Sequence, residues 1–193
     1  VMHTGGTSMP GSSTVTAQMV IDMDPDVVSH INGGTTAISV DEVKKLVTDT
    51  AYALEIVHCG NPRVAIETVK LALEHDALDR LIMGNDAPTG SGVIPLGLLR
   101  MLNFLSSLTP IRPEQAFCLS TGHAARVFRL NRGEISPGKE ADLVIMDAPV
   151  GSMGENALAA LATGDVPGVS MVLVEGEIKV IKSRNTPPAT RQA

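Results

Sequence analysis

The sequence predicts an α/β fold built on a parallel β-sheet, and two observations lead to this prediction. Between residues 26 and 128, short apolar segments typical of strands alternate with longer segments that have helical periodicity. The connecting segments are short and rich in turn-forming residues, so each helix is expected to cross over from one strand to the next. After Leu130 the alternation ends, and strand-like segments dominate the remaining chain.

Four strand and helix units are visible if His3 ends the first strand. The next three strands are expected over residues 26–32, 51–57 and 80–84. A capping box opens the helix after the second strand, because Ser39 is a good N-cap and Glu42 follows three residues later. This helix runs to about Thr50. The later helices are expected over residues 61–78, with Pro62 at the first helical position, and over residues 95–107 and 113–128.

The chain after Leu130 predicts a small β unit. Residues 133–140 are rich in turn formers, residues 141–147 read as a buried strand, and strands are expected over residues 170–174 and 178–182. The last eleven residues contain two adjacent prolines and are expected to be extended or disordered. The predicted domains are therefore residues 1–130, residues 131–182 and a tail of residues 183–193.

Composition restricts the class of protein. The chain has 193 residues, 44% of them hydrophobic, which suffices for a sizeable core. Its net charge is −6 and its basic residues are scattered, which argues against nucleic-acid binding. No apolar run approaches the length of a membrane span, so we expect no membrane association and a cytoplasmic protein. Cys59 and Cys118 lack CxxC spacing and are expected to be buried, reduced thiols.

Polar groups follow three of the predicted strands at the points where those strands end. His3 precedes Thr4-Gly5-Gly6, His30 precedes Ile31-Asn32-Gly33-Gly34, and Asp86 follows Gly84-Asn85. The carboxyl ends of parallel strands are where such enzymes keep their chemistry. Imidazole and carboxylate are ligands of catalytic divalent metals, so the trio predicts most of a metal site.

Three glycine-rich segments do not match the known phosphate-binding motifs. These segments are Gly5-Gly6, Gly33-Gly34 and Gly90-Ser91-Gly92. Tight turns and close backbone approach are the expected reasons for these glycines.

The segment from Gly133 to Asp147, which reads GEISPGKEADLVIMD, resembles the C-terminal signature of the amidohydrolase superfamily. A Thr-Gly-x-x-Ala-Arg segment at Thr121 to Arg126 precedes it, as the signature requires. Members of this superfamily are distorted (β/α)8 TIM barrels with a flanking β-sandwich. The resemblance therefore implies that this chain is the C-terminal half of such a barrel together with the C-terminal strands of the sandwich.

The resemblance also implies roles for individual residues. His3 and His30 take the places of the metal-binding histidines on strands five and six, and Asp86 takes that of the metal-binding and catalytic aspartate on strand eight. His58 ends another strand, and we expect it to contact the substrate. The His-x-His of strand one and the bridging Lys or Glu of strand four have no counterpart here, so we expect them in a preceding half of the protein.

A closer likeness within the superfamily extends over nearly the whole chain. Its carriers are MHTGGTS (2–8), VVSHINGG (27–34), GNP (60–62), GNDAP (84–88), IPLG (94–97) and KSRNTPP (182–188). The likeness implies a metal-dependent hydrolase that opens a cyclic amide of a small carboxylated heterocycle, a centre of zinc and iron, and a homo-oligomer. We expect the 193-residue segment alone to have little activity, because half a barrel exposes two strand edges.

Two alternatives stay open at the level of sequence. In the first, the protein is another cyclic amidase or deaminase of the superfamily, of the imidazolonepropionase or dihydroorotase type. In the second, it is a non-catalytic member that keeps the barrel as an assembly scaffold.

Overall fold

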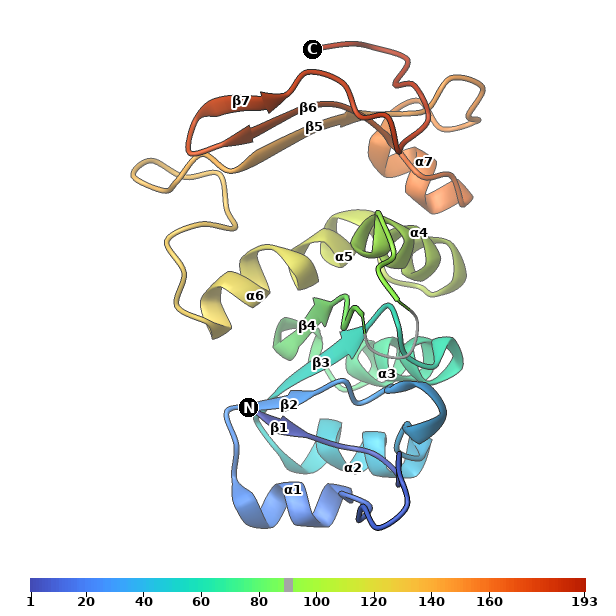
Figure 1. The fold of residues 1–193 in the computed structure, drawn as a ribbon, viewed down its shortest axis with the longest axis vertical. Coiled ribbons are helices and arrows are strands. Elements are labelled where there is room, and N and C mark those ends of the chain that lie inside the picture. The colour runs from blue at the N-terminus through green and yellow to red at the C-terminus, as the bar shows by residue number, and fades with distance from the viewer. Residues whose placement is uncertain (89–91) are drawn as a thin grey trace. The chain divides into compact units, whose positions relative to one another are not determined.

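A four-stranded parallel sheet organises the first half of the chain. In this computed structural model, which describes residues 1–88 and 92–193, the strands follow one another across the sheet in sequence order (Figure 1). They are β1 (Met2–His3), β2 (Val27–Ser29), β3 (Ala53–Val57) and β4 (Leu81–Gly84). The predicted α/β fold with a parallel sheet is confirmed.

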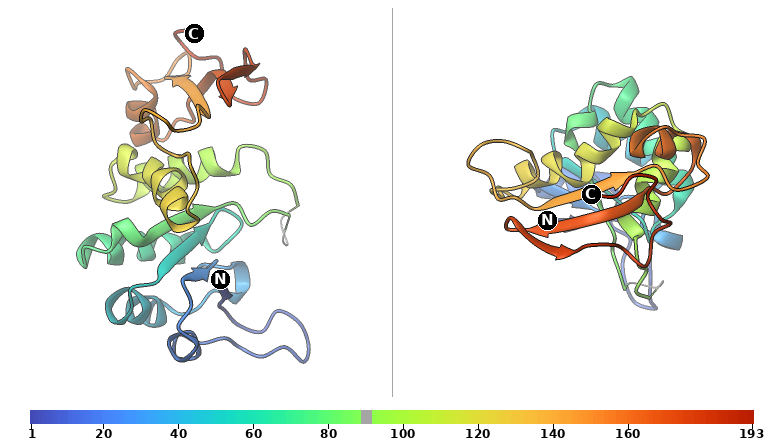
Figure 2. Two further views of the ribbon diagram at one scale, coloured as in Figure 1. Left: turned by 90° about the vertical axis from the view of Figure 1, so that its left-hand side faces the viewer. Right: turned by 90° about the horizontal axis from the view of Figure 1, so that it is seen from above.

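Three helices accompany this sheet. They are α1 (Ala17–Met23), α2 (Val40–Asp49) and α3 (Pro62–Glu74), with single 3-10 turns at Gly34–Thr36 and Leu78–Arg80. Helix α1 contacts α2, and α2 contacts α3, so the helices form a layer beside the strands (Figure 2). Successive strand residues are buried, namely Val27 and Val28 of β2, Ile56 and Val57 of β3, and Leu81 and Ile82 of β4. Burial of successive residues, which point to opposite faces, is typical of a parallel sheet covered on both sides.

The predicted capping box is present and does more than cap one helix. Ser39 Oγ accepts from the Glu42 N–H at 3.3 Å, and Glu42 Oε2 accepts from the Ser39 N–H at 3.3 Å. The other carboxylate oxygen, Oε1, accepts from the backbone N–H of Ala17 at 3.1 Å. Glu42 therefore joins the start of α2 to the start of α1. Helix α1 was not expected from the sequence, although Thr16 caps it by accepting from the N–H of Met19.

The chain divides into two compact units, Val1–Gly97 and Leu98–Ala193. The second unit contains helices and a three-stranded antiparallel sheet in the order β5-β6-β7. Its elements are α4 (Gly97–Leu108), which begins at the last residue of the first unit, α5 (Pro113–Ser120), α6 (Gly122–Val127), β5 (Leu143–Asp147), α7 (Ala157–Thr163), β6 (Gly168–Val174) and β7 (Glu177–Val180).

One helical prediction for this unit is corrected, and one helix was missed. The single helix expected over residues 113–128 is broken at Thr121, whose backbone has φ −122° and ψ −96°, and Gly122 then begins α6. Helix α7 was not expected. Asn156 caps its start by accepting from two backbone N–H groups, and Gly164 ends it in the left-handed conformation at φ 95°.

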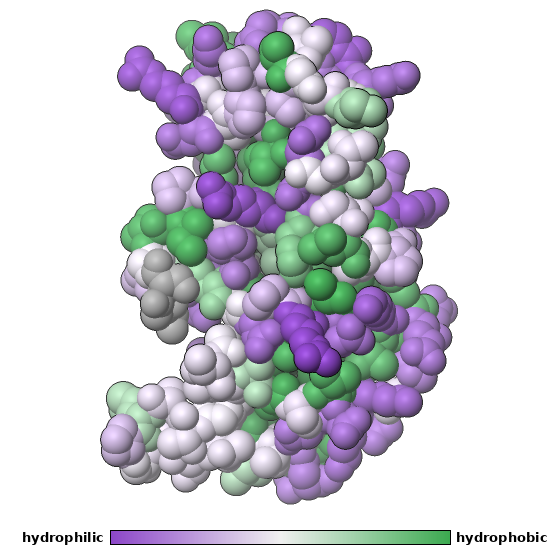
Figure 3. Space-filling model, turned by 90° about the vertical axis from the view of Figure 1, so that its right-hand side faces the viewer, coloured by the Kyte–Doolittle hydropathy of each residue, from purple (hydrophilic) through white to green (hydrophobic). Residues whose placement is uncertain are grey.

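The strand expected to be buried over residues 141–147 is partly exposed. Val144 and Ile145 of β5 are 51% and 41% exposed. In the space-filling view, hydrophobic residues reach the surface among hydrophilic ones (Figure 3). A neighbouring strand therefore covers the edge of β5 without covering both of its faces.

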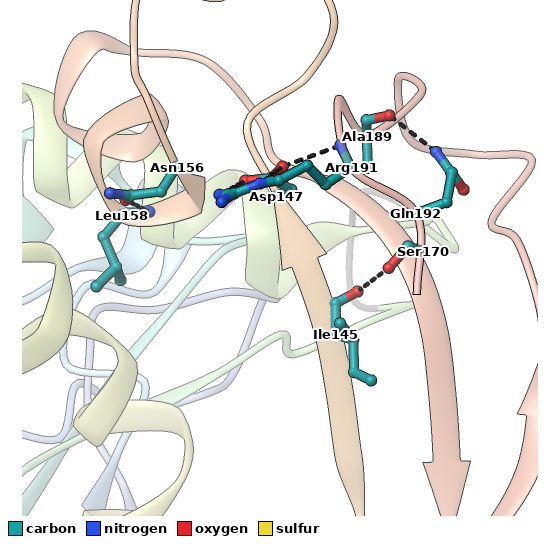
Figure 4. Close-up of polar contacts among 8 residues, drawn as sticks. All are labelled: Ile145, Asp147, Asn156, Leu158, Ser170, Ala189, Arg191 and Gln192. Carbon is teal, nitrogen blue, oxygen red and sulfur yellow. Dashed lines mark hydrogen bonds and ion pairs between the residues drawn. The ribbon is translucent and has the colours of Figure 1, made fainter.

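The C-terminal tail, which was expected to be extended or disordered, has no helix or strand but is held in place by specific contacts. The Arg191 guanidinium donates two hydrogen bonds to the carboxylate of Asp147 at the end of β5, from Nε to Oδ2 at 2.7 Å and from Nη2 to Oδ1 at 2.7 Å (Figure 4). The backbone of Ala189 pairs with Pro149 in an isolated bridge, and the Ala189 side chain is buried. A bidentate ion pair and a β-bridge thus hold the tail against the sheet.

The expectations for the cysteines and the glycine turns are confirmed only in part. Cys59 is half-buried and Cys118 is exposed, so the expected burial of both thiols is wrong, although neither is in a disulfide. Gly5 has φ 131°, and a Cβ there would overlap the carbonyl oxygen of Thr36, which confirms the expected close approach. The expected turn at Gly90-Ser91 lies outside the described residues. Within the described residues, every helix is too short or too polar to cross a membrane.

Candidate functional site

His3 and His30 come together at the ends of adjacent strands. His3 is the last residue of β1 and pairs in register with Ser29, while His30 follows directly after β2. Nδ1 of His3 and Nε2 of His30 face each other in hydrogen-bonding contact, and the ring centroids are 4.6 Å apart with the planes at 44°. The parallel register therefore turns two sequence positions 27 residues apart into one imidazole pair.

The backbone at His30 is held in an unusual conformation. His30 has φ 37°, in the left-handed region that a residue with a Cβ seldom adopts. Its carbonyl accepts from the N–H of Gly33 at 2.7 Å, which closes a tight turn. A Cβ on Gly33 would stand 3.0 Å from Nδ1 of His30, so glycine leaves room for the ring. The turn directs the imidazole out of the strand and towards His3.

Asp86 is the second residue after β4, whereas His30 is the first residue after β2. It is half-buried and has φ 54°, so it shares the left-handed backbone of His30. Within residues 1–88 and 92–193, no three His, Cys, Asp or Glu side chains are close enough together to hold a metal. The structure therefore brings the two histidines together and does not complete the predicted trio with Asp86.

His58 lies at the same edge of the sheet, one residue beyond β3. Its backbone N–H donates to the carbonyl of Gly84 at 3.1 Å, and the next N–H, of Cys59, donates to the carbonyl of Asn85 at 3.2 Å. These bonds continue the pairing of β3 with β4 up to the residue before Asp86. His30, His58 and Asp86 thus follow three neighbouring parallel strands at their carboxyl ends.

Two residues beside the site were missed in the sequence. Asn32 is completely buried and bonds to the backbone of Val57, which ties the turn after β2 to the end of β3. Glu55 accepts from Ser29 Oγ and from the backbone N–H of His30. One signal for Glu55 was available, because it is a single carboxylate within the otherwise apolar strand Ala53–Val57.

The imidazole pair fits a divalent metal by the chemistry of its donors. Two facing ring nitrogens share at most one proton, so at least one lone pair is directed at the other ring. Nδ1 of His30 is buried and has no hydrogen-bond partner among the described residues, which leaves the tautomer of that ring unfixed by the protein. Neutral imidazole suits zinc and iron. His3 and His30 can therefore supply two ligands, and a metal site needs more.

Comparison with known proteins gives a consistent set of relatives. Residues 23–179 match the model of the amidohydrolase family. The chain is 58% identical over 192 residues to the enamidase of Eubacterium barkeri, with all of this chain and 50% of that protein covered. A crystal structure of enamidase superposes with a TM-score of 0.95 at 58% identity, over 99% of this chain and 50% of that one.

A more distant structure shares the fold alone. The β-aspartyl dipeptidase of Fervidobacterium islandicum superposes with a TM-score of 0.61 at 15% identity, over 94% of this chain and 48% of that one. The chain thus spans about half the length of the relatives that it matches.

Proposed function

Because this chain belongs to the amidohydrolase family, we propose that the full-length protein containing it is a metal-dependent hydrolase of a cyclic amide. The observation that carries this proposal is the facing pair of ring nitrogens from His3 and His30 at the ends of adjacent parallel strands. The proposed reaction is that of an enamidase, in which 6-oxo-1,4,5,6-tetrahydronicotinate is opened to 2-formylglutarate and ammonium. The 58% identity to the Eubacterium barkeri enamidase supports this choice of substrate.

The proposed architecture is the C-terminal half of a distorted (β/α)8 barrel. Strands β1 to β4 then correspond to strands five to eight, and strands β5 to β7 to the C-terminal strands of a flanking sandwich. The parallel order of the first four strands and the half-length superposition on enamidase support it. We keep the domain boundary after residue 130, because the α/β alternation ends there.

We assign the metal to His3, His30 and Asp86, with zinc and iron proposed from the likeness. Such a metal, when bound, polarises an amide carbonyl and makes water nucleophilic near neutral pH. The remaining ligands are proposed to come from the other half of the protein.

Asp86 is proposed to move the proton. Its carboxylate accepts a proton from the attacking water as the C–N bond of the amide is hydrolysed, and then donates that proton to the leaving nitrogen. The ring opens to an enamine, and a second water hydrolyses the enamine to the aldehyde and ammonium. His58, at the same edge of the sheet, is proposed to contact the substrate. The likeness further supports a cytoplasmic homo-oligomer with a small-molecule substrate.

The test is to express the full-length protein and measure bound metal together with ammonium release. We expect bound metal, and faster ammonium release from 6-oxo-1,4,5,6-tetrahydronicotinate than turnover of dihydroorotate or imidazolonepropionate. Metal with turnover of one of the other two compounds alone would keep the hydrolase and reject the substrate. A protein that binds no metal would contradict the proposal and favour a scaffold.

A further inference from the structure

The carboxylate of Glu55 lies in a row of polar side chains across an otherwise apolar sheet. His3 pairs in register with Ser29, and the register of β2 with β3 places Glu55 beside Ser29. Glu55 in turn pairs with Ile82 of β4. Residues that share a row of a parallel sheet point to the same face. His3, Ser29 and Glu55 therefore point to one face, although that layer of a barrel is ordinarily filled by bulky apolar side chains.

Glu55 makes three contacts with the segment that carries His30. Its Oε2 accepts from Ser29 Oγ and, at 3.3 Å, from the backbone N–H of His30. Its own backbone carbonyl accepts from the N–H of Ile31 at 3.0 Å. One residue thus accepts from two successive backbone N–H groups, on the two sides of the left-handed His30.

The neighbouring strand is shaped to admit this carboxylate. A Cβ built on Gly84 of β4 would stand 2.5 Å from Oε1 of Glu55, too close for any side chain to be tolerated without movement. Gly84 does not need glycine for its own backbone, because its φ is not positive. The space kept by Gly84 is therefore space for Glu55.

A strained backbone persists only where its surroundings hold it. The left-handed conformation of His30 directs its ring to His3, and Glu55 holds the strand side of that turn while Gly33 holds the other. We propose that Glu55 is a positioning residue that fixes the metal-binding orientation of His30. This inference rests on the proposed metal function. It assigns Glu55 no contact with the substrate and no proton transfer.

The test uses the full-length protein, stripped of metal and titrated with Co²⁺, whose visible absorption reports the geometry of its ligands. We compare wild type with Glu55→Ala, Glu55→Gln and the matched surface control Glu74→Gln, since Glu74 is exposed on α3. Loss of a group that orients a metal-binding histidine typically weakens metal affinity about 10- to 100-fold. We expect a loss of this size in Glu55→Ala, together with an altered Co²⁺ spectrum.

The other variants separate positioning from simple packing. Glu55→Gln keeps an oxygen that can accept from both donors, so we expect it to restore affinity to within about threefold of wild type. Glu74→Gln should match wild type. If Glu55→Ala fails to fold, the Co²⁺ affinity and spectrum of Glu55→Gln test the positioning role instead. A large loss of Co²⁺ affinity in folded Glu55→Gln overturns the proposal.

Different results would exclude the positioning role of Glu55 and the metal function of the protein. Wild-type affinity and an unchanged spectrum in folded Glu55→Ala would overturn the positioning role while leaving the metal function intact. A wild-type protein that binds no Co²⁺ would overturn the proposed function, and the role of Glu55 with it.

Discussion

Asn32 and Val57 are joined by two hydrogen bonds that imitate a strand pairing beyond the end of β2. The Asn32 amide Nδ2 donates to the Val57 carbonyl at 2.9 Å, and the Val57 N–H donates to Asn32 Oδ1 at 2.7 Å. Nδ2 also reaches the carbonyl of Asn61 at 3.3 Å. Asn32 is completely buried, so water cannot replace its side chain as the hydrogen-bond partner of these backbone groups. The side chain therefore links the turn after His30 to the end of β3.

Replacing Asn32 with Ala should destabilise the full-length protein by about 3 kcal/mol. The change leaves the N–H of buried Val57 without a partner, which costs about 1 to 3 kcal/mol. It also removes the donor to the carbonyls of Val57 and Asn61, at about 1 kcal/mol for each bond, although the Val57 carbonyl keeps its bond from the Gly60 N–H. Urea denaturation measures the effect, with Asn185→Ala as an exposed control. Equal stability of the two variants would show that the Asn32 bonds contribute nothing.

Replacing Glu42 with Ala should cost more stability than replacing Ser39 with Ala. The Ser39 variant loses the N-cap bond, worth about 1 kcal/mol, and the bond from Ser39 Oγ to Glu42 Oε2, which the Glu42 variant loses as well. The Glu42 variant loses the bond to the Ser39 N–H and the bond to the Ala17 N–H that joins α1 to α2. Thermal unfolding of both variants gives the order, with Glu74→Ala for comparison. A larger loss in the Ser39 variant would contradict the double role of Glu42.

The ion pair of Asp147 with Arg191 should make stability depend on pH in the acid range. Hydrogen bonds from the Arg191 guanidinium lower the pKa of the Asp147 carboxyl far below its usual range, against the opposing effect of burial. A carboxyl with a lowered folded-state pKa stabilises the protein above its unfolded pKa of about 3.9. That stability is lost as the pH falls below about 4 towards the folded-state pKa.

Melting temperature against pH checks this prediction in wild type and Asp147→Asn. The difference between the two proteins should be constant from pH 7 to pH 5 and shrink below about pH 4. A difference that does not change with acidification would rule out the ion pair as its source.

Replacing Gly84 with Ala should displace the carboxylate of Glu55. The new Cβ would stand 2.5 Å from Oε1 and 3.4 Å from Cδ of Glu55. Oε1 is the end of a flexible side chain that can turn away, so the cost comes from the bonds of Glu55 Oε2 to Ser29 and His30, worth about 1 to 3 kcal/mol together. Gly122→Ala is the matched control, since its Cβ would meet only one carbonyl oxygen at 3.6 Å. Melting temperatures of the full-length variants check the prediction, and equal values for the two would show that the space at Gly84 is not needed.

The sequence predicts best where a single local rule decides the structure. The capping box at Ser39 and the strands that end near His3, His30 and Asp86 follow from local chemistry and apolar patterning, and the parallel order follows from the crossover helices. Helices α1 and α7 escaped prediction because each has only seven residues, too few for a clear apolar period. The tail escaped because the Asp147–Arg191 pair joins residues 44 apart.

The same limit applies to the candidate site. The sequence identified His3 and His30 by residue type and position, and register alone brings their rings together. Glu55 was hidden, because its importance lies in contacts with the Ser29 hydroxyl and the His30 backbone across a strand boundary. A charged residue within an apolar strand is a signal, but it does not identify the partner of that residue.

The most direct measurement is a zinc titration of the metal-free full-length protein by calorimetry. It compares wild type, His3→Ala and His30→Ala with the surface control His75→Ala. His75 is an exposed histidine at the end of α3. We predict that His75→Ala binds zinc as wild type does, and that His3→Ala and His30→Ala each lose binding at one site. Zinc binding that is the same in all four folded proteins would contradict the claim that the facing imidazoles of His3 and His30 hold a metal.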